Sequence, residues 1–359
     1  MTLPVPLPHL STLRPYQAAG SSRVLYNLSA NEACLGPSPV AVDAATQAAR
    51  SLGTYPEGSA LALRTAIGQR YDLDPDQIIC GAGSEELIAL IVQAYAAPGD
   101  EVLFTQYGFI KYELAARAQG AVPVRAPEQA FTADVNALLA KVGRSTRIVF
   151  LANPNNPTGT CIDDTEVRQL RAGLRADILL VIDAAYAEFV ESDDYSDGLQ
   201  IARETQNTLA LRTFSKIHGL AGLRCGWGFG DRALIDNLHK VRGAFNVNAV
   251  AQAAAAAAIQ DGAHEERARA HNIQEMTWLT GRLTDAGISF IPSVCNFVVV
   301  RFSSADQCQA ALRELAEERV LAMPLNGYGL PDALRITLGT RAANEAVLTA
   351  LSRAHHAST

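Results

Sequence analysis

Residues 178–186 of this 359-residue chain read ILLVIDAAY, and they give the clearest indication of its architecture. Five apolar residues follow one another without polar alternation before the run reaches Asp183. A strand of this kind is buried on both faces, which is typical of a parallel sheet covered by helices. A carboxylate that leaves such a strand must find a partner or be neutralised, because burying an isolated charge is costly. The stretch therefore predicts a central strand with a polar group at its carboxyl end.

Similar apolar runs lie on both sides of this strand, and helical patterns separate most of them. The expected strands are residues 78–80, 101–104, 121–124, 148–152, 178–183, 208–213 and 225–229. The expected helices between them are residues 84–96, 110–119, 134–142 and 163–174. This alternation predicts an α/β fold with a mostly parallel seven-stranded sheet, and ligands of such sheets bind beyond the carboxyl ends of the strands.

The pattern changes near residue 246, which indicates a second, smaller α+β domain. A long helical tract reaches residue 286, and after it we expect a helix over 305–318 and short strands near 288–290, 297–302 and 334–338. At about 150 residues per domain, one large and one smaller domain suit this length. The expected parts are an arm (1–45) that packs with the small domain, a large cofactor-binding domain (46–245) and a small C-terminal domain (246–359).

The composition limits the classes of partner. Lys and Arg number 30 against 37 Asp and Glu, which gives a net charge of −7, whereas a general nucleic-acid binder needs surplus basic residues. No signal-peptide pattern opens the chain, and its longest small apolar stretch, residues 249–259, is shorter than the roughly 20 residues of a membrane span. Six cysteines without a CxxC pair indicate reduced core thiols. We therefore expect a cytoplasmic protein that binds neither nucleic acid, membrane nor metal.

Several loops that follow the predicted strands carry polar groups. Residues 81–86 read GAGSEE between a strand and a helix, so free backbone N–H groups and a hydroxyl can face a phosphate. The segment lacks the third glycine of the GxGxxG motif, and on its own it is equally typical of a tight connection. Residues 153–159 read NPNNPTG, and two X-Pro steps fix a turn that can hold an amide toward a ligand. Tyr107 ends another strand and could cover a flat ligand or line the core.

Residues 213–216, which read TFSK, add a lysine at a strand end, and Arg224 follows eight residues later. Beside two hydroxyls and a second cation, such a lysine can be held at a lowered pKa as an amine nucleophile. Each feature alone is compatible with an ordinary loop. Together with Asp183 and Tyr186 they fit pyridoxal phosphate, which needs a lysine for its Schiff base, an acid that keeps its ring nitrogen protonated and an anion site for its phosphate.

On these residues the chain resembles the fold-type I pyridoxal-phosphate aminotransferases, and among them the histidinol-phosphate aminotransferase family. The likeness runs over almost the whole chain, from RPY at 14–16 and LSANE at 28–32 to LRITLGT at 334–340. Its most specific motifs are NPNNPTG at 153–159, DAAY at 183–186, SK at 215–216 and GLR at 222–224. The resemblance implies an aspartate-aminotransferase-like fold and a homodimer with shared active sites.

The resemblance also implies a role for each matching residue. Lys216 would form the Schiff base and then act as the base, Asp183 would pair with the ring nitrogen, and Tyr107 would stack on the ring. Hydrogen bonds to the cofactor's O3′ are implied for Asn156 and Tyr186. Contacts with the cofactor's phosphate are implied for Gly83, Ser84, Thr213, Ser215 and Arg224, and from the neighbouring subunit for Tyr55. Arg335 would bind the substrate's α-carboxylate, and further substrate contacts are implied for Tyr16, Asn31 and Asn156.

One position departs from the family pattern. The family commonly has an arginine five residues before the tyrosine of its Tyr-Gly-Leu segment, where it helps to bind a second anionic group of the substrate, and here that position is Met323. A neutral, flexible methionine favours an apolar or aromatic side chain over a phosphorylated one. Losing one charged contact typically weakens anion binding by about 1.5 to 3 kcal/mol. Residues 31–34, NEAC, also differ from the more usual Asn-Glu-Asn-Pro.

The sequence therefore predicts a transaminase that moves an amino group from glutamate to imidazole acetol phosphate, the keto partner of histidinol phosphate. Two alternatives share the cofactor: an aromatic amino acid transaminase, supported by Met323, and a decarboxylase of the threonine-phosphate type. Two others do not require it. An α/β sheet also suits a nucleotide-binding oxidoreductase, although the GxGxxG motif is missing, and a catalytically silent binding protein has no evident need for the full cofactor set.

Overall fold

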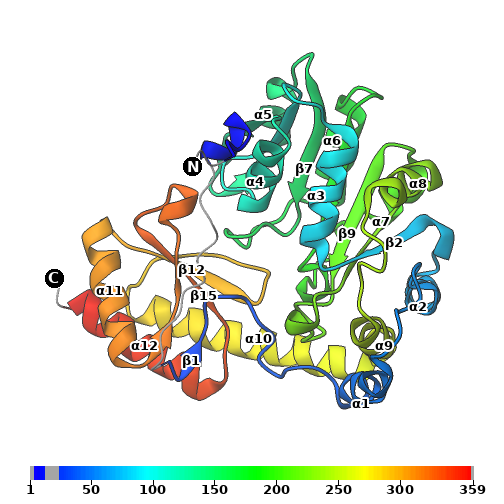
Figure 1. Cartoon of the computed structure of the whole chain (residues 1–359). Coiled ribbons are helices and arrows are strands. Elements are labelled where there is room, and N and C mark those ends of the chain that lie inside the picture. The colour runs from blue at the N-terminus through cyan, green and yellow to red at the C-terminus, as the bar shows by residue number, and fades with distance from the viewer. Residues whose placement is uncertain (1–3, 13–23, 357–359) are drawn as a thin grey trace.

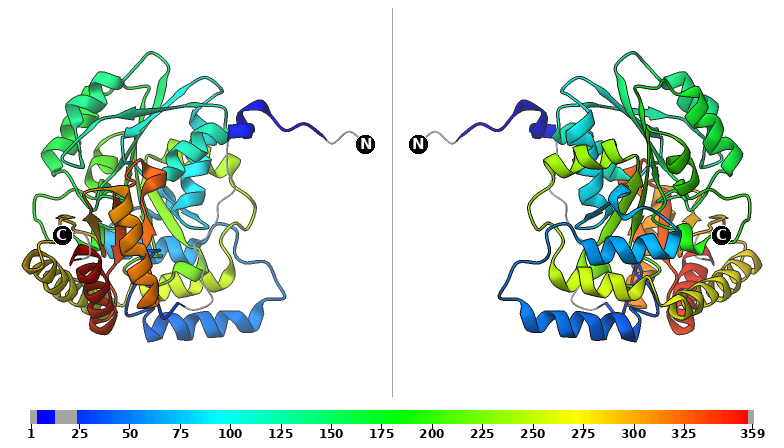
Figure 2. Two further views of the ribbon diagram at one scale, coloured as in Figure 1. Left: turned by 90° about the vertical axis from the view of Figure 1, so that its left-hand side faces the viewer. Right: turned by 90° about the vertical axis from the view of Figure 1, so that its right-hand side faces the viewer.

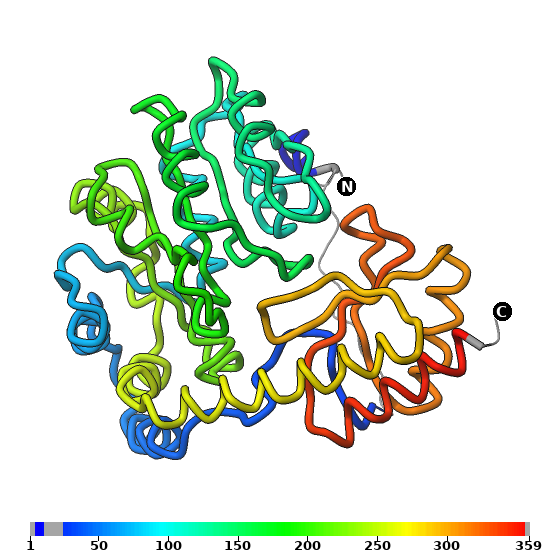
Figure 3. The backbone as a smooth tube through the Cα atoms, turned by 180° about the vertical axis from the view of Figure 1, so that it is seen from behind, coloured from blue at the N-terminus to red at the C-terminus, as the bar shows by residue number. Residues whose placement is uncertain are grey.

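The computed structural model describes residues 4–12 and 24–356. Figure 1 shows a large sheet with helices on both faces and, beside it, a smaller sheet with helices of its own. Helix α10 (Gly262–Asp285) runs beneath both, as the view from behind in Figure 3 also shows. Within the described ranges, no helix combines the length and the apolar character needed to span a membrane.

The large sheet has seven strands in the order β2-β10-β9-β8-β7-β3-β4. Its strands are β2 (Ile78–Gly81), β3 (Glu101–Thr105), β4 (Val122–Ala126), β7 (Thr146–Ala152), β8 (Leu179–Asp183), β9 (Thr208–Thr213) and β10 (Gly226–Gly230). β10 is antiparallel to β2 and β9, while β3, β4, β7, β8 and β9 pair in parallel. The predicted mostly parallel sheet is confirmed, and the strand ends lie within two residues of the expected ones.

Helices cover both faces of this sheet and pack on apolar cores. They are α2 (Leu61–Tyr71), α3 (Ser84–Tyr95), α4 (Ile110–Ala118), α5 (Val135–Lys141), α6 (Asp164–Gly173), α7 (Leu199–Glu204) and α8 (Arg232–Val241). The four predicted helices are α3 to α6. α6 starts with a capping box, in which the Asp163 and Glu166 side chains each accept from the other's backbone N–H.

The helical tract expected from about 246 to 286 is helical, and it consists of two helices, α9 (Ala249–Ala258) and α10. The break lies at Asp261, whose side chain accepts from His264 N–H and thereby starts a new helix. The alanines of α9 pack into the core under the large sheet, against α1 (Pro39–Ala48). Figure 2 shows α1 and α9 side by side. Small side chains let the two helices approach closely.

The small sheet is antiparallel, with order β11-β12-β15-β14. Its elements are β11 (Phe290–Ile291), β12 (Phe297–Arg301), β14 (Met323–Pro324), β15 (Ala333–Thr337), α11 (Ala305–Glu317) and α12 (Arg341–His356). β1 (Tyr26–Asn27) and β13 (Val320–Leu321) form a separate, parallel two-stranded sheet, and Thr337 N–H of β15 donates to Leu28 O at 2.8 Å, which joins the arm after residue 24 to the small sheet. The remaining elements are a hairpin of β5 (Glu128–Gln129) with β6 (Thr132–Ala133) and 3-10 turns at Pro8–Thr12, Ala49–Ser51, Pro75–Gln77, Ala187–Phe189, Ala221–Leu223 and Asn326–Tyr328.

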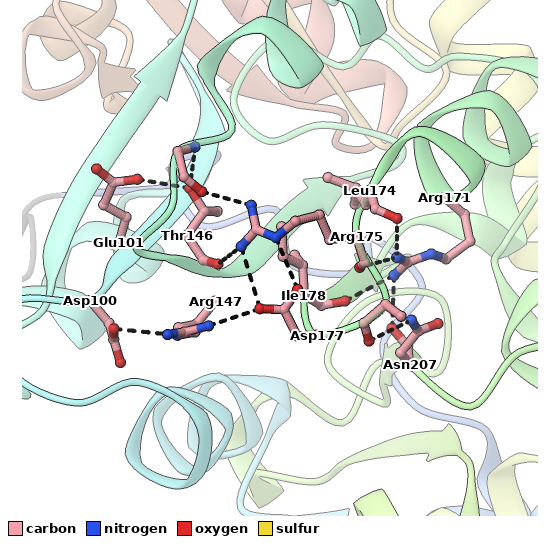
Figure 4. Close-up of polar contacts among 12 residues, drawn as sticks. Asp100, Glu101, Thr146, Arg147, Arg171, Leu174, Arg175, Asp177, Ile178 and Asn207 are labelled. Carbon is pink, nitrogen blue, oxygen red and sulfur yellow. Dashed lines mark hydrogen bonds and ion pairs between the residues drawn. The ribbon is translucent and has the colours of Figure 1, made fainter.

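A polar network holds the amino-terminal edge of the large sheet (Figure 4). Arg171 on α6 donates to four backbone carbonyls at 3.0 to 3.2 Å, those of Leu174, Arg175, Ile178 and Asn207. Nearby, Arg147 and Arg175 both pair with Asp177. The Arg171 guanidinium thus binds the carbonyl of Leu174 at the end of α6 together with carbonyls just before β8 and β9, and it fixes α6 against the start of these strands.

Candidate active site

The loops that follow β2, β7, β8 and β9 converge at the carboxyl edge of the large sheet, where they meet the small sheet. Arg335 of β15 donates to Asn156 Oδ1, and Val294 N–H donates to Gly159 O at 2.9 Å. The sheet edge at which the sequence predicts a ligand is therefore covered by residues from the C-terminal third of the chain.

Asp183 ends β8 and is buried, with 5% of its surface exposed. Its Oδ2 accepts a hydrogen bond of 2.7 Å from the hydroxyl of Tyr112, whose ring stacks on Phe150. Its Oδ1 finds no hydrogen-bond partner among the described residues. Burial raises the pKa of Asp183 to about 6, against the hydrogen bonds from Tyr112 and the Ala185 N–H. One oxygen is thus held in place, and the other is open to a ligand.

Lys216 lies in the loop that follows β9. Ser215 N–H donates to Thr213 Oγ1 at 3.1 Å and turns this loop back on the strand. Lys216 Nζ donates to two carbonyls of the arm, Ala30 O at 3.0 Å and Asn31 O at 3.2 Å. The amine is therefore directed by backbone that lies 185 residues or more away in sequence.

The surroundings of Lys216 also set its charge. Burial lowers the pKa of Lys216 to about 7, and the positive charges of Arg335 and Arg224 lower it further, while Glu32 raises it. Near pH 7 a large share of this amine is neutral, which is the form that attacks a carbonyl carbon.

A cradle for an anion lies where β2 meets α3. Gly83 has φ +84°, and a Cβ there would lie 2.5 Å from Arg224 Nη2; a Cβ on Gly226 would lie 2.4 Å from Ser84 N. Arg224, with φ +56°, donates from Nη1 to Ser215 Oγ at 3.2 Å. Backbone N–H groups at the start of a helix, two hydroxyls and a guanidinium therefore surround one position, as an anion site requires.

Arg335 is buried, with 6% of its surface exposed, and its guanidinium is only partly satisfied. Nη1 donates to Asn156 Oδ1 and Nη2 to Ser29 O, the latter at 2.6 Å. Within the described part of the chain Nε has no hydrogen-bond partner. A fixed guanidinium with a free N–H suits a carboxylate ligand.

Asn31 of the arm forms hydrogen bonds with residues of both domains. Its backbone is left-handed, with φ +54°. Its N–H donates to Thr337 Oγ1 at 2.9 Å, and its Nδ2 donates to the hydroxyl of Tyr186 at 2.8 Å. Asn296 Nδ2 donates to Asn31 O at 3.2 Å. Burial raises the pKa of Tyr186, so this hydroxyl stays protonated at neutral pH.

An apolar wall borders the site on the small-sheet side. Met323 stands opposite Arg335 in the β14–β15 pair, and, like Tyr107 and Phe131, it packs against a buried apolar cluster that includes Tyr328. The ring of Tyr107 lies 5.6 Å from that of Phe131. Where the family pattern has a cation, this chain presents a neutral side chain among aromatic rings.

Two aromatic residues at the start of α4 are near the candidate site. Phe109 is the N-cap of α4, and its ring meets Tyr112 edge-on at 5.8 Å. Tyr112 is in turn the residue that holds Asp183. The stacking role of Tyr107 stays a prediction, and Phe109 is a second ring to test for it.

One predicted residue, Tyr55, lies apart from this cluster. The ring of Tyr55 is 81% exposed and stacks on Phe245 at 4.6 Å, on the surface of the chain. Tyr16 falls outside the described residues.

Sequence reasoning missed three residues, Tyr112, Thr337 and Asn296. Tyr112 lies within a predicted helix, where an aromatic residue is typical of the core, and no motif marked it. Its contact with Asp183 spans 71 residues, and that of Thr337 with Asn31 spans 306. The one feature of the sequence that could have indicated Tyr112 is its hydroxyl, because a polar group is unusual on the apolar face of a helix.

A family model, related sequences and solved structures all match this chain over nearly its whole length. A family model described as aminotransferase class I and II matches residues 23–351. A histidinol-phosphate aminotransferase of Paramagnetospirillum magneticum is 48% identical over 358 residues, 98% of each chain. The crystal structure of a histidinol-phosphate aminotransferase from Sinorhizobium meliloti, in complex with pyridoxal-5′-phosphate, matches with a TM-score of 0.90 at 25% identity, over 98% of each chain. An aspartate aminotransferase of Thermus thermophilus, 22% identical, shares the fold, with a TM-score of 0.85 over 98% of this chain and 100% of that one.

Proposed function

This chain belongs to the class I and II aminotransferases, and from this premise we propose that it catalyses a transamination in which histidinol phosphate and glutamate are the two amino compounds. The cofactor is pyridoxal 5′-phosphate, and each half-reaction passes an amino group between an amino compound and the cofactor. The observation that carries the proposal is the convergence of Lys216, Asp183 and the Arg224 cradle at one edge of the sheet.

The residues at this edge fit the cofactor. Asp183 Oδ1, unpartnered among the described residues, is an acceptor for a ring N–H, and the Arg224 guanidinium lies directly against Gly83 at the start of α3, where an anion would meet it together with free backbone N–H groups. We propose that Gly83, Ser84, Thr213, Ser215 and Arg224 hold the phosphate. When bound, pyridoxal phosphate supplies an aldehyde that takes up the amino group and a ring that draws electrons from the substrate's Cα.

Lys216 is the proposed nucleophile and base. Its Nζ, directed by the carbonyls of Ala30 and Asn31, would anchor the cofactor as a neutral amine and would carry a proton away from the substrate's Cα, so one side chain would serve as nucleophile and base. A pKa of about 7 suits both duties, because both protonation states are populated near neutral pH.

Asp183 is proposed to stabilise the protonated ring nitrogen through Oδ1, while Tyr112 holds Oδ2. An ionised carboxylate beside a cation favours the charged form of both partners. Asn156 and Tyr186 are proposed to donate to the cofactor's O3′. Arg335 is proposed to bind the α-carboxylate of the amino donor, with Asn156 and Ser29 keeping its plane fixed.

A second candidate function, transamination of aromatic amino acids, is favoured by Met323 and its aromatic neighbours. A neutral wall does not attract a substrate phosphate, and aromatic rings pack well against it. The two functions use the same cofactor site and differ in the substrate's side chain.

A homodimer is also part of the proposal. Tyr55 and Phe245 form a stacked aromatic pair at the surface, with 81% and 42% of their surfaces exposed. We propose that Tyr55 reaches the cofactor's phosphate in a second copy of the chain. Mixing an inactive Lys216→Ala chain with an inactive Tyr55→Ala chain should restore part of the activity if sites are shared, and no recovery would contradict it.

Single-turnover kinetics tests the proposed function. The purified enzyme with its cofactor is mixed with histidinol phosphate, glutamate or phenylalanine, and loss of the cofactor's visible band gives each half-reaction rate. We expect the largest specificity constant for histidinol phosphate; a larger one for phenylalanine would favour the second candidate. Carbon dioxide released from the amino acid, in place of a keto product, would contradict both.

A further inference from the structure

The hydroxyl of Tyr186 carries a proton for which the described residues provide no acceptor. Its oxygen accepts a hydrogen bond of 2.8 Å from Asn31 Nδ2, and no hydrogen bond within the described ranges leads from the hydroxyl to another group. Because burial raises the pKa of Tyr186, the proton stays on the oxygen at neutral pH. A buried hydroxyl normally donates as well as accepts. The direction of this proton is therefore a property that the neighbours of Tyr186 can set.

The side chain of Asn31 is oriented so that its amide nitrogen, and not its amide oxygen, faces Tyr186. The backbone N–H of Asn31 donates to Thr337 Oγ1 at 2.9 Å, and this hydroxyl in turn donates to Asn31 Oδ1 at 3.2 Å. If the amide were turned over, two N–H donors would point at Thr337 Oγ1, and the threonine proton would face an NH2 group. Thr337 thus selects the orientation that presents Asn31 Nδ2 to Tyr186.

The backbone of Asn31 is fixed in the same site. The residue is 1% exposed, and its φ of +54° is a conformation that asparagine adopts more readily than most residues. Its carbonyl accepts from Lys216 Nζ and from Asn296 Nδ2, each at 3.2 Å. Every polar group of Asn31 therefore has a partner in the protein, and two of these partners are Lys216 and Tyr186.

We propose that Asn31 is a positioning residue that directs the proton of Tyr186 toward the cofactor's O3′. Since Asn31 Nδ2 donates to the phenolic oxygen, the hydroxyl cannot give its proton to Asn31, and O3′ is the acceptor that a bound cofactor offers. A hydroxyl that accepts one hydrogen bond is also polarised into a stronger donor. This inference rests on the proposed function, because it requires pyridoxal phosphate in the site.

The remaining groups around Tyr186 are the same in every variant that the test needs. The ring of Phe297 on β12 meets the Tyr186 ring edge-on at 5.4 Å and holds its plane. Lys216 Nζ lies 5.7 Å from the centre of the Tyr186 ring. The other charged or titratable groups that act on the hydroxyl belong to Arg335, Cys295 and Tyr328.

The pH at which the cofactor's visible band changes reports on the hydrogen bonds at O3′. A donor at this oxygen favours its charged form and so lowers the midpoint of the transition. Asn31→Asp replaces one amide nitrogen by oxygen, so that the hydroxyl of Tyr186 would donate to the new carboxylate and no longer to O3′. Absorbance of the holoenzyme, measured from pH 5 to 10 without substrate, gives the midpoint.

The charge of the new carboxylate must be separated from the change in hydrogen bonding, because a negative charge nearby also raises the midpoint. Asn31→Asp is therefore made in the natural chain and again in the Tyr186→Phe chain, where only the charge acts. Asn272→Asp is the matched control. It makes the same exchange of nitrogen for oxygen in a buried amide that donates to Cys295 O at 3.1 Å.

We expect Asn31→Asp to raise the midpoint by about half to one pH unit more in the natural chain than in the Tyr186→Phe chain. Asn272→Asp should change the midpoint equally in both chains. Equal shifts for Asn31→Asp would overturn the inference and leave the proposed function intact, whereas a chain that binds no coloured cofactor would contradict both.

A neutron structure of the unaltered holoenzyme answers the same question if Asn31→Asp does not fold. Deuterium on the Tyr186 oxygen should point toward O3′, with both amide deuterium atoms of Asn31 on the nitrogen that faces Tyr186. Deuterium pointing from Tyr186 toward Asn31 would overturn the inference.

Discussion

One oxygen of the Asp183 carboxylate accepts a hydrogen bond from the protein, and the other is available to a ligand. The hydroxyl of Tyr112 is the donor that holds the first oxygen. Without the hydroxyl of Tyr112, both oxygens would lie in an apolar surround, and burial already raises the pKa of Asp183 to about 6. Tyr112 is a positioning residue in this account: it acts on the cofactor through Asp183.

Tyr112→Phe should therefore move the acid limb of the activity profile to higher pH by about one to two units. The lost hydrogen bond to a charged group is worth about 1.5 to 3 kcal/mol, and 1.36 kcal/mol corresponds to one pH unit. Rates measured from pH 5 to 9 check this. Tyr95→Phe removes a partly buried hydroxyl that donates to Leu234 O and is the control. An unmoved limb, with only a loss of stability, would leave Tyr112 a purely structural role.

The variant Met323→Arg tests whether the apolar wall at Met323 selects the substrate. A cation opposite Arg335 would attract a second anionic group, so the specificity constant for histidinol phosphate relative to phenylalanine should rise about tenfold or more. Met323→Leu, which keeps the wall apolar, should leave the ratio within about twofold. An unchanged ratio in the arginine variant would reject a selective role for Met323.

At the scale of elements, the junction of β2 with α3 has room only for glycine. Ala at position 83 would need φ +84° and a Cβ within 2.5 Å of Arg224 Nη2, which Ser215 and Ala221 hold in place. At φ +84° and ψ 162° the backbone lies in a region that is essentially restricted to glycine and costs another residue about 1 to 3 kcal/mol. The cradle would then be displaced.

Gly83→Ala should weaken cofactor binding at least tenfold, measured by equilibrium dialysis with pyridoxal phosphate. Gly222→Ala is the control, because a Cβ there meets nothing within 4 Å. Equal affinity in the two variants would contradict the assignment of the phosphate to this junction.

The strands of the large sheet and their burial on both faces could be predicted, because an unbroken apolar run such as residues 178–182 is typical of a strand in a sheet that helices cover. The break between α9 and α10 could not, since Gln260 and Asp261 interrupt an otherwise continuous helical pattern and only the cap at Asp261 shows that the chain turns. For the site, Asp183 and Lys216 could be predicted from their places at the ends of apolar strands. Tyr112 and the Asn31 contacts needed the three-dimensional fold, because a single hydrogen bond across many residues leaves no local pattern.

At the scale of the whole molecule, three parts of the chain build the surroundings of one amine. The arm supplies the carbonyls of Ala30 and Asn31, the large sheet supplies Arg224, and the small sheet supplies Arg335. Burial and the positive charges of Arg335 and Arg224 lower the pKa of Lys216 to about 7, against Glu32 of the arm, which raises it.

Attachment of the cofactor should therefore depend on pH in a defined direction. Below about pH 7 Lys216 is protonated and cannot attack, and above it the neutral amine predominates, so the rate of holoenzyme formation should rise from pH 6 to 8 and then level off. Stopped-flow absorbance of cofactor-free enzyme mixed with pyridoxal phosphate measures it. A rate that keeps rising to pH 10 would mean that Lys216 has an ordinary pKa.

The most direct test of the central claim is to locate the cofactor on the chain. The sequence has four lysines, Lys111, Lys141, Lys216 and Lys240, so borohydride reduction of the holoenzyme followed by peptide mapping gives an unambiguous answer. The account predicts a pyridoxyl group on Lys216 in a stoichiometry of about one per chain. A label on one of the other three lysines, or a chain that stays colourless with excess pyridoxal phosphate, would contradict it.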